Sequence, residues 1–436
     1  MGKLVGRIVG FFIFLAVFCS ATLVILAVSS GLIDPWQMFP GLPRPPQIAI
    51  DTGDIPIPAP QLPEIDIPDA LKGEVVLLGD QVQRRPLMTR IPAPQQLSTE
   101  PRVIGANFSL AILMALIFGA CTTVLGNMLR DEEPRIQAWL KAFGVDRLLP
   151  GIGKFFQWTA SRGVKRGCLT LPFVALIFAL YGIIFAFLEK GTSILSREGA
   201  FLAVTMAFSV GLVSFSGDIA RRIMGRLWRT GSEFHVYPAN LLIAALSVGI
   251  SRLFGLSPGI AFGTPGGADM KLPEAHRKKR EVVLAAVTLG TVLLFGALGW
   301  GLSGLVISAL SVPFDTRIAP LVARLLTAGQ NIGLALFLVA LETGFFELLP
   351  LAYGDGRVIF RWNKLVWALV FIPLAFLFNH ALLNPQSGFL DSFLISNVRF
   401  LWGVMLILVG LTAGLWFYFN VVDDVLRDWL GIRLPG

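Results

Sequence analysis

The sequence predicts an all-α polytopic membrane protein, with about eight transmembrane helices and one further segment that enters the membrane without crossing it. Of its 436 residues, 55% are hydrophobic and 15% are charged, and the mean hydropathy is +0.72. Soluble domains carry about 25% charged residues. Several apolar runs approach the ~20 residues that a helix needs to cross a bilayer. These runs are continuous rather than alternating, which argues against a transmembrane β-barrel.

Residues 1–30 are predicted to form an N-terminal membrane anchor. The apolar run 11–28 is longer than the 7–15 residues typical of a signal-peptide core. Lys3 and Arg7 precede it, which favours a cytoplasmic N-terminus. Cleavage after Ala27-Val28-Ser29 is the alternative.

Residues 31–105 are expected to be an extracytoplasmic segment. Proline-rich tracts such as residues 56–60 fix φ and remove backbone donors, which favours extended chain. Short strands are possible at residues 65–67 and 74–78. The segment is interpreted either as a spacer or as a small ectodomain that binds a partner.

Residues 106–200 contain two predicted spans, 108–125 and 169–188. Between them lies a cytoplasmic loop, 126–168, in which Ile136, Trp139, Leu140 and Phe143 recur at helical spacing. This pattern predicts an amphipathic helix on the inner membrane surface, or one packed against the helix bundle.

Residues 201–385 are predicted to form the membrane core, with spans at 201–216, 282–310, 323–350 and 365–383. Basic residues on both sides of segment 241–259 place both of its ends in the cytoplasm. A re-entrant or partly buried hairpin is therefore expected there. The glycines along 282–310 predict close helix packing.

Residues 386–436 hold the last predicted span, 400–419, and a cytoplasmic tail, so both termini are expected in the cytoplasm. Short basic loops of this kind suit a bacterial plasma membrane. The net charge of +8 follows from these loops, and no recognition motif suggests nucleic acid.

The three histidines are not spaced as a helical pair of metal ligands. His276 belongs to a basic loop. His380 lies near the outer end of a span and is expected to be a polar packing residue. His235 is the only histidine close to the cytoplasmic corner where polar residues gather.

Two polar clusters converge on that cytoplasmic side. Asp218 and Arg221 share one helix face at the end of the span 201–216, and Asp355 follows the span 323–350. Charges at membrane depth generally pair. The sequence therefore predicts an ion pair between Arg221 and either Asp355 or Asp218. The alternative is that all three charges lie among the lipid headgroups.

The ten residues that end at Gly356 resemble the second active-site motif of the site-2 (M50-type) intramembrane zinc metalloproteases, Asn-x-x-Pro-x-x-x-Leu-Asp-Gly. Pro350, Asp355 and Gly356 match it in type and spacing, whereas Glu347 and Gly354 replace its asparagine and leucine. In that family the aspartate is a zinc ligand.

The first motif of that family, HExxH, would fall on residues 217–221, counted back from the strand-like stretch 230–238. Gly217 and Arg221 stand where the two zinc-binding histidines would be, and Asp218 replaces the glutamate that serves as general base. The resemblance covers roughly residues 200–385.

The resemblance implies a site-2-protease-like core with a vestigial site, formed by Gly217, Asp218, Arg221, Glu347, Pro350, Asp355 and Gly356. The resulting hypothesis is a non-catalytic pseudoprotease without a cofactor, in which an Arg221–Asp355 pair closes the old zinc position. Removing Arg221 is expected to destabilise the fold by several kcal/mol. The expected role is that of a scaffold or regulator, with the lipid bilayer and a membrane or extracytoplasmic protein as partners.

Two alternatives remain open. A transporter or channel would make use of the glycine-rich segment 255–267. An atypical active protease would bind zinc through His235, Asp218 and Asp355.

Overall fold

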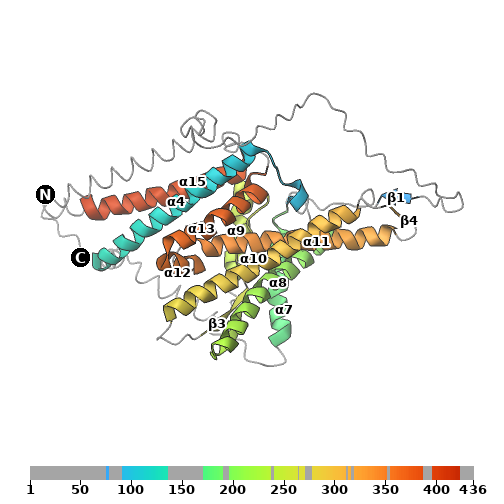
Figure 1. Cartoon of the computed structure of the whole chain (residues 1–436), viewed down its shortest axis with the longest axis horizontal. Helices are drawn as coiled ribbons and strands as arrows, with labels where there is room; N and C mark the ends of the chain where they lie inside the picture. Colours follow the sequence, from blue (N-terminus) through green and yellow to red (C-terminus); the bar gives the residue numbers. More distant parts are fainter. Residues whose placement is uncertain are drawn as a thin grey trace, which may run out of the picture.

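The computed structural model describes residues 75–77, 91–135, 170–189, 196–236, 240–263, 265–270, 277–310, 313–315, 319–350, 354–385 and 395–422. Within these ranges the chain is largely helical, and six helices are long and apolar enough to cross a membrane (Figure 1). This supports the prediction of an integral membrane protein. The expected anchor at 11–28, most of the proline-rich segment, most of the loop 126–168, His276 and the tail lie outside the described residues.

The six long apolar segments follow the predicted spans. They are formed by α4 (Pro101–Asp131), α8 (Arg197–Leu227), α10 (Arg277–Leu310), α11 (Ala319–Leu348), α13 (Lys364–Phe378) with the π-helical turn Asn379–Leu383, and α15 (Ser396–Phe417). The predicted span at 169–188 corresponds to α7 (Thr170–Ala186), a shorter apolar helix.

Helix α8 extends beyond the predicted membrane span 201–216. The helix continues past Ser216 to Leu227, because the intervening sequence contains no proline and its arginines are good helix formers. Trp228 is its C-cap residue, and the following Arg229 has a positive φ of 53°. The extension carries Asp218 and Arg221 on regular helix.

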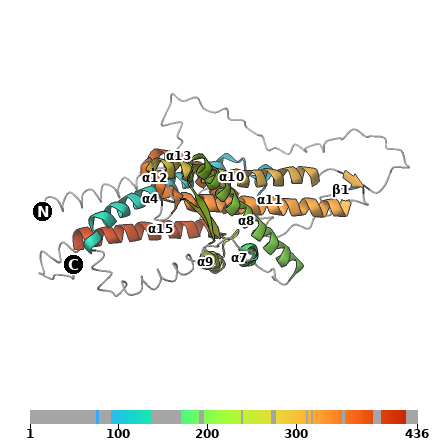
Figure 2. The ribbon, with the colours of Figure 1, turned by 90° about the horizontal axis from the view of Figure 1, so that it is seen from below.

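Helices α10 and α11 run side by side, as Figures 1 and 2 show. A Cβ atom added to Gly299 would lie 2.9 Å from the carbonyl oxygen of Gly333, and one added to Gly296 would lie 2.6 Å from a side chain of α11. The predicted close packing is thus confirmed at these two glycines. It is wrong for Gly290 and Gly301, where an added Cβ would meet nothing within 4 Å.

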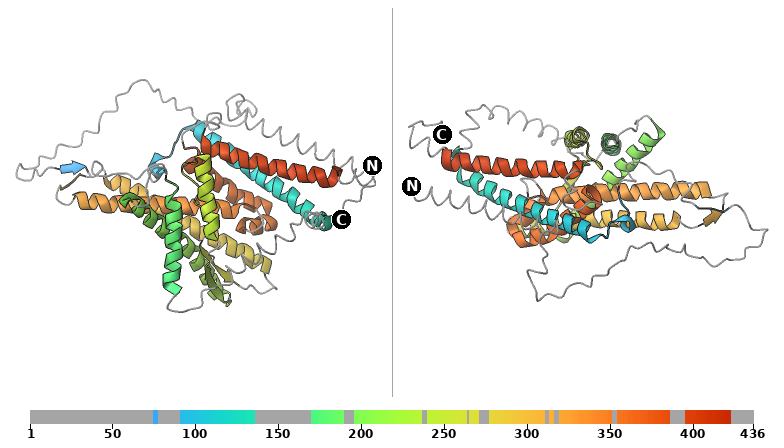
Figure 3. Two further views of the ribbon diagram at one scale, coloured as in Figure 1. Left: turned by 180° about the vertical axis from the view of Figure 1, so that it is seen from behind. Right: turned by 90° about the horizontal axis from the view of Figure 1, so that it is seen from above.

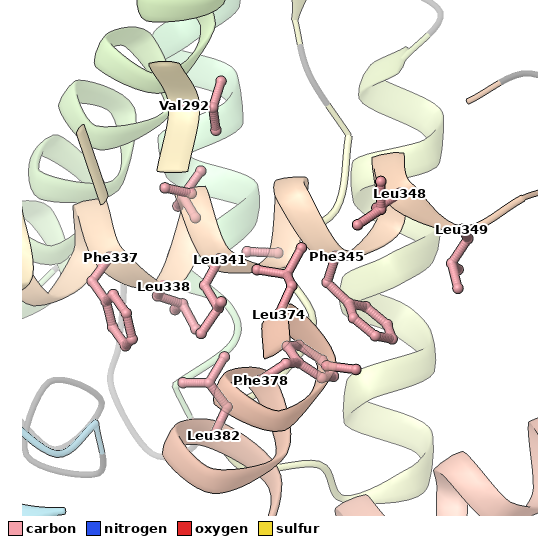
Figure 4. Close-up of a cluster of buried hydrophobic side chains, with 14 of the residues drawn as sticks. Val292, Phe337, Leu338, Leu341, Phe345, Leu348, Leu349, Leu374, Phe378 and Leu382 are labelled. Carbon is pink, nitrogen blue, oxygen red and sulfur yellow. The ribbon is translucent and has the colours of Figure 1, made fainter. Parts of the chain in front are cut away.

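Apolar side chains fill the space between α11 and α13 (Figure 4). The rings of Phe345 and Phe378 stack with centroids 4.1 Å apart, and Leu341 and Leu374 lie beside them. Aromatic pairs of this kind contribute about 0.5–1.5 kcal/mol beyond their buried area. This packing fixes α11, and with it the polar corner at its C-terminal end.

Helix α4 lies against α15 and against α13 (Figure 3). A neutral network links α4 to the end of α13. The Asn107 side-chain amide donates to His380 Nδ1 at 3.0 Å and to the Asn384 carbonyl at 2.9 Å, and Asn384 Nδ2 donates to Asn107 Oδ1 at 3.1 Å. His380 Nε2 donates to the Ser98 carbonyl at 3.0 Å, since a carbonyl can only accept. His380 is therefore a helix-packing residue, as predicted.

Two short strand pairs complete the described fold. β1 (Val75–Leu77) confirms the strand expected near residues 74–78 and pairs with β4 (Pro313–Asp315), at the far end of α10 and α11 in Figure 2. β2 (Ser232–Val236) pairs with β3 (Gly266–Met270) in antiparallel register, with Val236 opposite Gly266.

The register of β2 and β3 decides the path of the segment between them. This segment contains the 15-residue helix α9 (Asn240–Phe254) and the irregular stretch 255–263. Because Val236 and Gly266 are partners, the chain returns to the place from which it left. This return is what the predicted hairpin requires, whereas a single crossing of the membrane would leave the two ends of the segment apart.

Side chains satisfy the backbone of the irregular stretch. Asn397 of α15 bonds both the amide and the carbonyl of Ser257, at 2.9 and 2.8 Å. Ser251 accepts from the amide of Ile260 at 2.8 Å. The Glu342 carboxylate accepts from the amide of Ala261 at 2.5 Å. Non-helical backbone at membrane depth requires such internal partners.

Candidate functional site

A small polar cavity of about 70 Å³ lies where α8, α10 and α11 meet. The first residue of β3 and the start of α12 (Asp355–Trp362) close it. The volume has room for a few water molecules. Its polar and charged lining residues are Ser214, Asp218, Arg221, Thr288, Thr343, Glu347 and Asp355.

Helix α8 contributes Gly217, Asp218 and Arg221 to the cavity. Gly217 lets α8 approach α10, since an added Cβ would lie 3.3 Å from Thr288 Cγ2. Asp218 follows and is only 3% exposed, and Arg221 lies on the same helix face. The structure therefore brings these three residues to one cavity.

The corner between α11 and α12 carries Glu347 and Asp355 to the same cavity. Pro350 disfavours continuation of the helix, and α11 ends at Leu348. The Glu347 carboxylate lies against the backbone amide of Asp355. Helix α12 itself was not predicted, because the sequence there indicated only a turn.

Close backbone contact explains the glycines of this corner. A Cβ at Gly356 would overlap the carbonyl of Leu348. One at Gly354, where the family motif has leucine, would lie 2.9 Å from the Glu347 carbonyl oxygen. The first turn of α12 thus rests directly on the last turn of α11, which fixes Asp355 relative to Glu347.

The predicted ion pair between Arg221 and Asp355 is present. Arg221 Nη2 lies 3.7 Å from Asp355 Oδ2, and each side chain is 27% exposed. The distance exceeds that of a charge-assisted hydrogen bond, about 2.7–2.9 Å, so the attraction is mainly electrostatic. Burial raises the pKa of the Asp355 carboxyl above its usual value, and the Arg221 guanidinium offsets part of that rise.

The donor set gives little support to a metal centre. Among the described residues, no three or more His, Cys, Asp or Glu side chains are positioned to hold a metal ion together. The backbone of His235 lies in β2 opposite Gly267, but its side chain is outside the described part of the structure. A guanidinium cannot bind a cation, and Arg221 lies beside Asp355.

Sequence reasoning missed some of the polar residues that the fold brings inside. Glu342 is 2% exposed and directly precedes Thr343, which lines the cavity. Glu342 could have been selected from the sequence, because a carboxylate within an apolar span is costly and marks a candidate site. The hydroxyls of Ser214 and Thr288 gave no such signal, because isolated Ser and Thr are common in membrane helices.

Comparison with known proteins gives no relative for this fold and site. No family model, no curated protein and no solved structure matches the chain.

Proposed function

We propose that this protein is a non-catalytic membrane scaffold or regulator built on a site-2-protease-like core. The observation that carries the proposal is the Arg221–Asp355 ion pair. It joins a residue at a lost histidine position to the residue at the third ligand position of the zinc proteases that the sequence resembles.

The physical argument concerns charge. A catalytic zinc site uses three protein ligands and keeps one position open for water. At this cavity Arg221 supplies positive charge opposite Asp355, the role that a metal would otherwise have. We propose that the pair replaces the metal and closes the site. The protein would then act by binding a membrane or extracytoplasmic protein in a bacterial plasma membrane, with both termini cytoplasmic.

The metal content of the detergent-purified full chain tests this proposal. Mass spectrometry should find no stoichiometric metal in the wild type or in Asp355→Ala, and neither protein should cleave a membrane-spanning peptide. About one zinc per chain, lost in Asp355→Ala, would overturn the proposal. In that case His235 and Asp218 would be the next residues to test for proteolysis.

A transporter is the second candidate, and the cavity favours it. Carboxylates beside a space with room for water are a feature of ion and proton pathways. Solute flux in liposomes that contain the purified protein would support transport and exclude a purely non-catalytic scaffold.

A further inference from the structure

A groove separate from the polar cavity lies at the surface of the helix bundle, between the end of α9 and the first half of α15. Its volume is about 290 Å³. It shares no lining residue with the polar cavity. Phe254 of α9 and Arg399, Phe400, Gly403, Val404 and Ile407 of α15 line it.

The fold fixes the two walls of this groove. The rings of Phe254 and Phe400 lie with their centroids 5.0 Å apart. Just beyond α9, Ser257 exchanges two hydrogen bonds with the Asn397 side chain at the start of α15. These contacts join the end of α9 to the start of α15 beside the groove.

The floor of the groove is hollow because residue 403 is glycine. A Cβ added to Gly403 would meet nothing within 4 Å. Val404 and Ile407 beside it are 39% and 65% exposed. On a membrane helix, apolar surface of this kind faces lipid chains rather than water.

Arg399 gives the groove a charged end. It lies one helical turn before Gly403, in the first turn of α15, and it is exposed. No acidic side chain of the described residues lies within ion-pair distance of it. Charged groups in membrane helices generally find a partner. At the end of a lipid-facing groove, the partner that fits a guanidinium is a lipid phosphate.

We propose that this groove binds an anionic glycerophospholipid. The phosphate pairs with Arg399, and one acyl chain lies along Phe400, Gly403 and Ile407. The volume is near the lower limit of ligand pockets, which suits part of an acyl chain rather than a headgroup. A net anionic headgroup is favoured because a zwitterionic one already carries a cation close to its phosphate.

Lipid binding to the delipidated full chain in detergent tests this assignment. Phosphatidylglycerol and phosphatidylcholine are titrated separately, and bound lipid is counted by native mass spectrometry. The wild type should bind phosphatidylglycerol about tenfold more tightly than phosphatidylcholine. Arg399→Gln should lose about that factor, and Gly403→Leu should lose binding by filling the groove.

Two matched variants serve as controls. Arg102→Gln removes an exposed arginine from the first turn of α4, and Gly414→Leu enlarges an open glycine elsewhere on α15. Both should bind phosphatidylglycerol like the wild type. Equal affinity of the wild type for the two lipids would overturn the proposal, as would unchanged binding in Arg399→Gln or Gly403→Leu. An equal loss in Arg102→Gln would likewise show that the attraction is not specific to this groove.

Discussion

The neutral network around His380 and the candidate site around Arg221 lie near opposite ends of α13, and they differ in their chemistry. The network of Asn107, His380 and Asn384 is uncharged, and its hydrogen bonds measure 2.9–3.1 Å. The candidate site instead sets one guanidinium, Arg221, against three carboxylates around a cavity, and its ion pair with Asp355 measures 3.7 Å.

The difference indicates what each cluster contributes. A complete neutral network satisfies buried groups and holds helices in register, so its value is structural. A cluster of partly buried charges around a cavity lowers the free energy of unfolding, and an apolar core would not carry this cost. The cavity, rather than the network, is therefore the place where a present or a former functional site is expected.

Of the substitutions that test this comparison, Gly356→Ala should change the free energy of unfolding the most. The added methyl group would overlap the Leu348 carbonyl, a backbone atom that no rotamer change can move. Overpacking against such a neighbour should lower the free energy of unfolding by about 3 kcal/mol. The measurement is denaturant unfolding of the full chain in mixed micelles. Gly301→Ala is the control, because an added Cβ there meets nothing within 4 Å and should slightly stabilise α10. Equal stability of the two variants would show that the corner is not fixed by this contact.

Asn107→Ala should lower the free energy of unfolding by about 2 kcal/mol, because it leaves His380 Nδ1 and the Asn384 amide without their partner. The same unfolding measurement checks it. Asn127→Ala, on the exposed part of α4, is the control and should change little. A small effect at Asn107 would mean that water replaces the network, and the structural role assigned to it would be wrong.

The two clusters also differ in how far the sequence predicted them. Long apolar runs identified the helices, and charges beside those runs identified the Arg221–Asp355 pair. Asn107 gave no signal, because its partners lie more than 270 residues away and only tertiary packing brings them together. The contact of Gly356 with Leu348 gave no signal either, because it depends on the conformation of the corner between α11 and α12. The cost of several kcal/mol that the sequence suggested for losing Arg221 rested on a buried pair, whereas both side chains are 27% exposed, so a smaller cost is now expected.

Arg221→Ala should therefore lower the free energy of unfolding by only about 1 kcal/mol, since a long and partly exposed ion pair contributes little. A double-mutant cycle with Asp355→Asn should give a coupling energy of about 0.5 kcal/mol or more. Arg222→Ala, an exposed neighbour, is the control for lost charge on α8. Zero coupling would mean that the pair does not close the site.

The smallest expected effect is a pH dependence that comes from Asp355. Burial raises the pKa of its carboxyl above the ordinary value of 3.8, and Arg221 opposes that rise. The folded state therefore binds the proton of the Asp355 carboxyl more tightly than the unfolded state does. Its contribution to stability is fully present below about pH 4 and is lost as the pH rises through the folded pKa.

Arg221→Ala should enlarge this loss, because the pKa of Asp355 rises further once the opposing guanidinium is gone. Asp355→Asn should remove the contribution. Unfolding curves of the wild type and the two variants between about pH 4 and pH 8 test both statements. The neutral network has no carboxylate, so Asn107→Ala should keep the wild-type contribution of Asp355. If Arg221→Ala and Asp355→Asn both follow the wild-type curve, the two residues are not electrostatically coupled, and the contrast between a charged site and a neutral network loses its basis.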